Sequence, residues 1–296
     1  MTRVTAIIPA HDRAHTLGRA LSSVLAQTRA PEELIVVDDG STDATPEVAA
    51  SFAGIRLLRL PRNAGAAHAR NAGAKAASGD YLAFLDSDDA WATDKLERQL
   101  AFLAAKPATD LLCTGITVHA VDDTVSDYTF GASPPAGGWT LEHLQTYPFS
   151  TSTWLIRRSA LAAAGFFDET LPNSEDLDLL SRLVRHNLIE MLPGALTIKH
   201  NQGDGLNRDY TKTVASTLEL FRRHADLWER APVAAARTWQ RLGVMHAGAG
   251  DMQQARAALW QATRRQPLEP RHWARLGLAC LGATAFRAVP AMLRRR

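Results

Sequence analysis

The run LIVVDDGSTD at residues 34–43 joins an apolar segment to a polar turn. Its first four residues, Leu34–Val37, are all apolar, which is typical of a strand that is buried on both faces of a parallel sheet. Asp38 and Asp39 follow at once, and Gly40 permits a tight turn. The two carboxylates either bind a ligand at the strand end or form an Asx turn that caps the next helix. The residues of this run alone leave both interpretations open.

The same alternation of apolar strands and helical segments extends over the first 120 residues. Short apolar strands separated by helices of this length predict an α/β fold with a mostly parallel central sheet and helices on both faces. The predicted strands are Val4–Ile8, Leu34–Val37, Ile55–Leu60, Tyr81–Leu85 and Leu111–Val118, and the predicted helices are Leu17–Ala26, Ala44–Ser51, Ala66–Ala77 and Thr93–Lys106.

Polar residues gather directly after three of these strands, at residues 11–13, 38–41 and 86–89. In an open α/β sheet the carboxyl ends of the strands form the crevice in which ligands bind. The sequence therefore predicts a ligand site at one edge of the sheet.

The composition is that of a folded protein from a reducing compartment. A chain of 296 residues with 46% hydrophobic and 22% charged residues suits one large α/β domain with a small appendage, or two modest domains. The two cysteines, Cys113 and Cys280, exclude a disulfide framework. We expect no signal peptide, because the strand pattern begins at Val4, and no spanning helix, because no apolar run reaches about eighteen residues. These features predict a cytoplasmic location.

Charge is distributed unequally along the chain. Residues 211–296 contain fifteen Lys and Arg and five Asp and Glu, a balance of +10, whereas residues 1–210 carry −8. The basic part suits an acidic surface, so we expect peripheral contact of this part with the inner face of the cell membrane or with a protein. The alternative is a helical core whose arginines face solvent.

The basic part also repeats. Trp239-x-x-Leu242-Gly243-x-x-His246 recurs 34 residues later as Trp273-x-x-Leu276-Gly277-x-x-Cys280. A helical pattern with this period is typical of tetratricopeptide repeats. The spacing predicts one and a half such repeats within an α-helical module at residues 211–296.

The middle of the chain is the least patterned. Asp, Gly and Pro predict a long loop over residues 120–150. Thr153–Arg157 is expected to be a strand, a helix is expected to start at Asn173 or Ser174, and Ala195–Ile198 is expected to be a strand that leads to His200.

Three further motifs place chemistry-bearing side chains near these elements. Asp86-Ser87-Asp88 follows a buried strand, so its two carboxylates point the same way, as a hard divalent cation carrying a diphosphate requires. The small residues of 63–73 allow close approach to a ligand and include Arg70, although a surface arginine explains that residue equally. GFFDE at 165–169 precedes the acidic run NSEDLD at 173–178, which otherwise only supplies negative charge at a helix start.

Taken in this order, the motifs at 34–43, 63–73, 86–89 and 165–178 resemble those of the family-2 glycosyltransferases with the GT-A fold. The resemblance extends from residue 4 to about residue 205. It implies a nucleotide-diphospho-sugar transferase fold in which residues 1–119 bind the nucleotide sugar and residues 120–210 bind the acceptor.

The resemblance also implies a catalytic base and a metal ligand. Asp176 resembles the base, with Glu175 orienting the acceptor and Asp178 as the second candidate for the base. A base is required because a single displacement at the anomeric carbon needs a carboxylate that takes the acceptor's proton. Asp88 resembles the ligand of Mn²⁺ or Mg²⁺, and His200 the histidine that completes the metal shell or touches the phosphate.

By the same resemblance the nucleotide sugar binds at the strand ends. Asp38 resembles the residue that hydrogen-bonds the nucleobase, Arg70 one near the base or diphosphate, and Asp86 the ribose contact. His11 and Asp12 stand where the family typically has a Tyr-Asn pair, so the resemblance implies that His11 stacks on the nucleobase in place of the tyrosine. The complete predicted set is Pro9, Ala10, His11, Arg13, Asp38, Asp39, Gly65, Arg70, Asp86, Ser87 and Asp88.

The implied activity is inverting, metal-dependent transfer of a single sugar from a nucleotide-diphosphate sugar to a hydroxyl acceptor. We expect a UDP-sugar donor, a glycan, lipid-linked or other hydroxyl acceptor, no nucleic acid partner, and a role in surface polysaccharide or glycoconjugate synthesis. Two alternatives stay open: a nucleotidyltransferase of related fold, and a non-catalytic scaffold whose repeats recruit partners. A dinucleotide oxidoreductase is disfavoured because no G-x-G-x-x-G follows the first strand.

Overall fold

The computed structural model describes residues 2–120, 124–129, 139–146, 149–186, 188–200 and 210–288 of the chain. The chain divides into two compact units. The first comprises Met1–Trp139 and Thr146–Arg208, and the second comprises Thr140–Gln145 and Asp209–Arg296.

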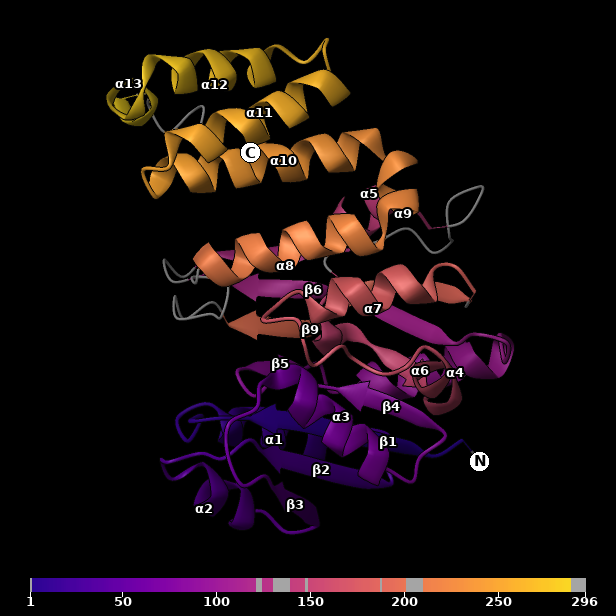
Figure 1. Ribbon diagram of the computed structural model, residues 1–296. Coiled ribbons are helices and arrows are strands. Elements are labelled where there is room, and N and C mark those ends of the chain that lie inside the picture. Colours follow the sequence, from indigo (N-terminus) through magenta and orange to yellow (C-terminus); the bar gives the residue numbers. More distant parts are fainter. Residues whose placement is uncertain are drawn as a thin grey trace. The chain divides into compact units, whose positions relative to one another are not determined.

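A single mixed sheet forms the centre of the first unit (Figure 1). Its strand order is β3-β2-β1-β4-β8-β6-β9-β5, with β7 paired to β6. Neighbouring strands are parallel from β3 to β4, as predicted, whereas β8 is antiparallel to both of its neighbours and makes the whole sheet mixed. The strands are β1 (Val4–Ala10), β2 (Glu33–Asp38), β3 (Ile55–Arg59), β4 (Tyr81–Phe84), β5 (Asp89–Trp91), β6 (Leu111–His119), β7 (Val125–Tyr128), β8 (Leu155–Arg157) and β9 (Ile189–His200).

Helices cover both faces of this sheet, as the sequence predicts. Alternate residues of β1, including Val4 and Ile8, pack in one apolar cluster with buried residues of α1 and α4. Ile7 points to the opposite face, where α3 approaches so closely that a Cβ atom at Gly73 would lie 2.6 Å from Ile7 Cγ2. The helices of this unit are α1 (Leu17–Leu25), α2 (Thr45–Ala50), α3 (Ala66–Ala76), α4 (Lys95–Ala105), α6 (Arg158–Ala163) and α7 (Glu175–Leu183), together with the 3₁₀ turn η1 (Thr151–Thr153).

The structure differs from the prediction mainly after residue 86. The segment predicted as a long loop contains β7 and, in the second unit, α5 (Leu141–Thr146). All four residues of β7 are exposed, so this strand has no apolar side to signal it. β9 begins six residues before the predicted strand, and its pairing with β6 is irregular where Gly194 adopts a φ of 115°. The residues Pro193 and Gly194 within β9 hid its first half, because such a pair normally ends a strand.

The second unit is helical. A Cβ atom at Gly243 would lie 2.6 Å from Leu259 Cγ, so α10 and α11 pack at close range. Trp239 stacks on Phe221 at 4.7 Å between ring centroids, whereas Trp273 is half-exposed, so the two members of the 34-residue repeat have different surroundings. The relation to tetratricopeptide repeats stays a prediction. The helices are α5, α8 (Tyr210–Arg223), α9 (Ala225–Glu229), α10 (Pro232–Gly248), α11 (Met252–Arg265), α12 (Pro270–Leu281) and α13 (Ala283–Ala288).

Among the helices in the described ranges, none combines the length and the apolar character that crossing a bilayer requires.

Candidate functional site

Three carboxylates meet where β4 ends and β5 begins. One oxygen each of Asp86, Asp88 and Asp89 lies within 4.8 Å of the others. The turn between the strands is fixed by the Asp89 N–H, which donates to the Asp86 carbonyl at 3.0 Å. Ser152 holds the turn from η1: its hydroxyl donates to Asp89 Oδ2 at 2.6 Å and accepts from the Asp86 N–H at 3.0 Å. The two aspartates of the predicted D-x-D motif are thus joined by a third, Asp89, which the sequence analysis did not select.

A lysine from β9 enters the same group of carboxylates. Lys199 is the direct register partner of Asp89, and its Nζ lies 2.9 Å from Asp89 Oδ2 and 3.8 Å from Asp86 Oδ2. Burial opposes the charged form of Lys199, but the Asp89 and Asp86 carboxylates outweigh it and raise the pKa of this lysine. Lys199 therefore carries its positive charge within the acidic cluster.

The three aspartates titrate differently because their surroundings differ. Burial would raise the pKa of Asp86, yet the Arg70 guanidinium and the Lys199 ammonium lower this pKa to about 2. Burial raises the pKa of Asp89 to about 6 despite Lys199. Burial and the neighbouring Asp86 carboxylate raise the pKa of Asp88 above its ordinary value. The cluster thus combines one carboxyl group of low pKa, Asp86, with two whose pKa is raised, Asp88 and Asp89.

Arg70 of α3 connects this cluster to the start of α7. Its side chain is buried, and it donates from Nη2 to Asp86 Oδ1 at 2.7 Å and from Nη1 to Glu175 Oε1 at 2.6 Å. The guanidinium also lies 5.5 Å from the centroid of the Phe167 ring. The structure therefore brings Arg70, Asp86 and Glu175 together from three different motifs, which a surface arginine would not do.

Asp176 lies beside Glu175 in the first turn of α7. Ser174, which precedes the helix, has a φ of 62°, and the Asp176 carboxylate accepts the Leu177 N–H at 2.7 Å. Burial, followed by the Glu175 carboxylate, raises the pKa of Asp176 to about 6. A carboxylate with this pKa is ionised at neutral pH and is still basic enough to accept a proton.

Asp178, the second candidate for the base, forms an ion pair with Arg182 of the same helix. Its carboxylate accepts from Arg182 Nε at 2.9 Å and from Arg182 Nη2 at 2.7 Å. Arg182 also donates to the carbonyls of Ala164 and Phe166, so this ion pair fixes the GFFDE turn against α7. Asp178 therefore stabilises the fold through Arg182, whereas Asp176 lies near Arg70 and Glu175.

The carboxylates of Asp38 and Asp39 both hold backbone turns. Asp38 Oδ1 accepts the Ser41 N–H, three residues further on, at 3.0 Å, and Oδ2 accepts from Arg59 Nε at 3.1 Å. Asp39 accepts the Ala64 and Gly65 N–H groups at 2.9 and 2.8 Å. This clamp holds the loop before α3, which positions Arg70.

The end of β1 and the turn that follows it contact residues that follow β2. The Ala10 carbonyl, which follows Pro9, accepts the Asp39 N–H at 2.8 Å, and the Arg13 N–H donates to Thr45 Oγ1 at 2.7 Å. His11 is half-buried, and its Nε2 lies 3.6 Å from Asp12 Oδ2. Its Nδ1 is buried without a hydrogen-bond partner, so the ring retains an unused polar atom.

His200 lies at the end of β9 and is the register partner of His119, with 5.0 Å between the ring centroids. Burial and the nearby Arg19 lower the pKa of His200, which favours the neutral, ligand-competent imidazole. Among the described residues, the group able to hold a metal consists of the three aspartates and does not include His200.

Three residues that contact the predicted site residues were not predicted from the sequence: Asp89, Lys199 and Ser152. Asp89 extends the acidic run of the D-x-D motif, which is a signal in the sequence, whereas Lys199 reaches the site only through the pairing of β9 with β5. Ser152 belongs to no motif, and only the packing of η1 against β4 reveals it.

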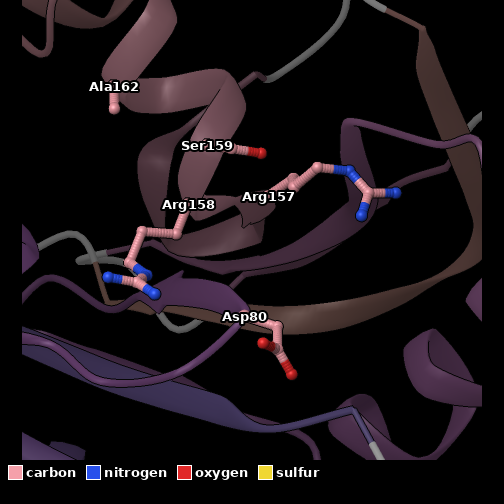
Figure 2. A pocket seen from close by; sticks show the side chains of 5 residues that line it. All are labelled: Asp80, Arg157, Arg158, Ser159 and Ala162. Atoms are coloured by element: carbon pink, nitrogen blue, oxygen red, sulfur yellow. The ribbon is translucent and has the colours of Figure 1, made fainter.

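A separate cavity of about 410 Å³ opens at the other end of β4 (Figure 2). Its lining includes Arg157, whose guanidinium makes structural contacts. The Nε atom lies 3.2 Å from Asp110 Oδ1, and Nη2 donates to the carbonyls of Pro107 and Thr109. The lining residues are Asp80, Arg157, Arg158, Ser159 and Ala162, and none of the predicted site residues is among them.

Comparison with known proteins covers the part of the site that precedes α7. Residues 5–164, more than half of the chain, match the family model described as glycosyl transferase family 2. The chain is 45% identical over 102 residues to UDP-Glc:alpha-D-GlcNAc-diphosphoundecaprenol beta-1,3-glucosyltransferase WfgD of Escherichia coli, covering 34% of this chain and 40% of the relative. It is 38% identical over 128 residues to the putative teichuronic acid biosynthesis glycosyltransferase TuaG of Bacillus subtilis, covering 42% and 50%. The chain thus spans half or less of these relatives.

Among solved structures, S. aureus TarS 1–349 is similar with a TM-score of 0.66 and 22% identity, over 96% of this chain and 89% of TarS. The same TarS segment in complex with UDP-GlcNAc gives a TM-score of 0.66 at 21% identity. At these identities the likeness concerns the fold, and it confirms the predicted GT-A type of α/β architecture.

Proposed function

The chain belongs to glycosyl transferase family 2, and from this premise we propose that it transfers a single sugar from a nucleotide-diphosphate sugar to a hydroxyl acceptor, with inversion and with a divalent metal. The observation that carries the proposal is the pair of hydrogen bonds by which Arg70 ties Asp86 to Glu175. This bridge supports the proposal because it connects the acidic cluster to the start of α7, which carries the proposed base, and a single displacement needs both groups at one site.

The donor set of the cluster fits Mn²⁺ or Mg²⁺. Both ions prefer carboxylate oxygens, and three such oxygens lie within 4.8 Å of one another. Asp88 is the proposed principal ligand, supported by Asp86 and Asp89, with His200 as a ligand of the loaded site or a phosphate contact. When bound, the metal would supply positive charge that stabilises the leaving diphosphate.

Asp176 is the proposed base that removes the proton from the acceptor hydroxyl. Its raised pKa of about 6 keeps it ionised at neutral pH and ready to accept that proton. Glu175 orients the acceptor, and its bond to Arg70 keeps it from moving away. The acceptor attacks the anomeric carbon as the bond to the diphosphate breaks, so the configuration of that carbon inverts.

The donor's nucleotide is proposed to bind along the ends of β1, β2 and β4. Because the Asp38 and Asp39 carboxylates already hold turns, these residues act partly by shaping the pocket. His11 is suited to stack on the base with its half-buried ring. The remaining proposed contacts are Pro9, Ala10, Arg13, Gly65, Arg70, Asp86, Ser87 and Asp88.

The substrates are proposed from the printed names of the relatives. WfgD uses a UDP-sugar and an acceptor linked to diphosphoundecaprenol, and TuaG is assigned to teichuronic acid biosynthesis. We infer a UDP-sugar donor and a lipid-linked or glycan acceptor in cell-surface polysaccharide synthesis.

Donor hydrolysis tests the proposal without knowledge of the acceptor. The full chain, incubated with a panel of UDP-sugars and Mn²⁺, is expected to release UDP from at least one donor, and chelation with EDTA is expected to stop the release. Water replaces the missing acceptor because the activated anomeric carbon remains open to attack. Absence of UDP release from every donor, with thermal shifts that show no donor binding, would contradict the proposal.

The second unit offers a surface that suits the membrane on which a lipid-linked acceptor resides. Trp260 and Trp273 are about half-exposed and lie 6.3 Å apart between ring centroids. The exposed arginines 256, 264 and 271 belong to the same two helices, α11 and α12. Indole rings favour the interface of a bilayer, and basic side chains favour anionic headgroups. We infer that this surface binds anionic lipid peripherally.

Co-sedimentation with vesicles checks this surface. The protein is expected to bind vesicles that contain anionic lipid at low salt, and to lose most binding at high salt or on neutral vesicles. Joint replacement Trp260→Ala and Trp273→Ala should weaken binding, whereas Trp139→Ala in the first unit should not. Vesicle binding that does not depend on lipid charge or salt would contradict this inference and favour a protein partner for this surface.

A further inference from the structure

Lys199 occupies a central place in the acidic cluster, although no sequence motif assigned it a role. Its position is fixed by the backbone, because β9 runs antiparallel to β5 and places Lys199 directly opposite Asp89. Its Nζ donates to Asp89 Oδ2 at 2.9 Å and to Ser150 Oγ at 3.0 Å, and it lies 3.8 Å from Asp86 Oδ2. The ammonium therefore contacts two of the three carboxylates that could hold a metal.

The positive charge of Lys199 offsets part of the negative charge of the three aspartates. Asp86, Asp88 and Asp89 bring three carboxylates into a volume a few ångströms across. Arg70 takes one oxygen of Asp86, and Lys199 lies beside the other. Asp89 is buried at 2% exposure, and its carboxylate accepts hydrogen bonds from Lys199 and Ser152.

We propose that Lys199 is a resident counter-cation of the acidic cluster, and that it makes divalent metal binding dependent on the diphosphate of the donor. The inference rests on the proposed function, because it assumes that the cluster binds a metal together with a nucleotide diphosphate. A divalent ion that enters alone meets the ammonium in the same cluster and is repelled. A diphosphate adds negative charge, which offsets the ammonium and offers it an anionic partner.

This arrangement has a functional consequence. The protein binds little metal until the donor binds. After the reaction, the product nucleotide and the metal dissociate together, because loss of either one weakens the binding of the other. The coupling is reciprocal: whatever factor the nucleotide adds to metal affinity, the metal adds to nucleotide affinity.

Calorimetric titration of the full chain with Mn²⁺, with and without UDP, measures the coupling directly. In the wild type, UDP is expected to tighten Mn²⁺ binding by about tenfold or more. In Lys199→Met, Mn²⁺ alone is expected to bind about tenfold more tightly than to the wild type, because a unit charge a few ångströms from a divalent ion has been removed. The gain that UDP adds should then shrink to about threefold or less.

Two control variants separate charge from structure. Lys199→Arg keeps the positive charge and should leave the affinity for Mn²⁺ alone close to that of the wild type. Lys106→Met breaks a comparable ion pair, Lys106 Nζ to Glu190 Oε1 at 2.9 Å, at the other end of the same strand, and should change neither affinity. Thermal unfolding confirms that each variant is folded, and Lys199→Gln repeats the measurement if Lys199→Met is not.

The outcomes distinguish this inference from the proposed function. If the wild type binds no Mn²⁺ even with UDP, the proposed metal site is wrong. If the wild type binds Mn²⁺ with UDP, but Lys199→Met binds Mn²⁺ alone no more tightly than the wild type, the metal site stands and the role of Lys199 is overturned.

Discussion

Replacement of Asp176 by Asn is expected to reduce sugar transfer by about 10²–10⁴-fold while donor binding persists, because the amide fills the same volume but cannot accept the proton. Single-turnover transfer measures the first effect, and calorimetry with the UDP-sugar measures the second. Wild-type transfer should also rise with pH through about 6, as the Asp176 carboxyl loses its proton, and then level off. Asp176→Asn should lose this rise.

Asp178→Asn is the matched control, since it makes the same chemical change two residues along the helix. It removes a charge from the Arg182 ion pair that fixes the GFFDE turn, so it should lower the melting temperature. Transfer by the folded fraction should persist. Near wild-type transfer by Asp176→Asn, or a loss confined to Asp178→Asn, would assign the base to a different carboxylate.

Asp88→Ala is expected to abolish the metal dependence of nucleotide binding. The variant loses the carboxylate proposed as principal ligand, so UDP should bind with the same weak affinity with and without Mn²⁺. Calorimetry of UDP with and without Mn²⁺ is the measurement. Asp94→Ala is the control, because Asp94 is a half-exposed aspartate whose Oδ2 lies 3.6 Å from Arg98 Nη1. A metal-dependent gain that survives in Asp88→Ala would reject the D-x-D motif as the metal site.

The parts of the site that the sequence predicted are those in which a strand end and a motif coincide. Asp86 and Asp88 follow a buried strand, and parallel neighbours carry their polar residues to the same edge. Arg70 and Glu175 were predicted as separate contributions from two motifs. That they share a hydrogen bond depends on the packing of α3 against the GFFDE turn, where Asn71 donates to the Phe167 carbonyl at 2.8 Å.

The parts that escaped prediction depend on antiparallel pairing between distant segments. Lys199 reaches Asp89 only because β9 pairs with β5 across 110 residues of sequence. Ser152 belongs to a 3₁₀ turn with no periodic pattern. Asp38 shows a different difficulty: a carboxylate after a strand is compatible with both a turn and a ligand, and the structure shows the turn while the ligand role remains a proposal.

The helix α5 has a consequence for how the second unit is encoded along the gene. Although residues on both sides of it belong to the first unit, Thr140–Gln145 belongs to the second. Leu141 and Leu144 are buried, and Glu142 accepts the Val233 N–H at 3.1 Å at the start of α10. The helical unit is therefore discontinuous in the gene, and recombination at a single breakpoint near codon 209 would leave one of its helices behind. A chimaera that exchanges the whole helical unit must therefore exchange Thr140–Gln145 together with the segment from Asp209 onward.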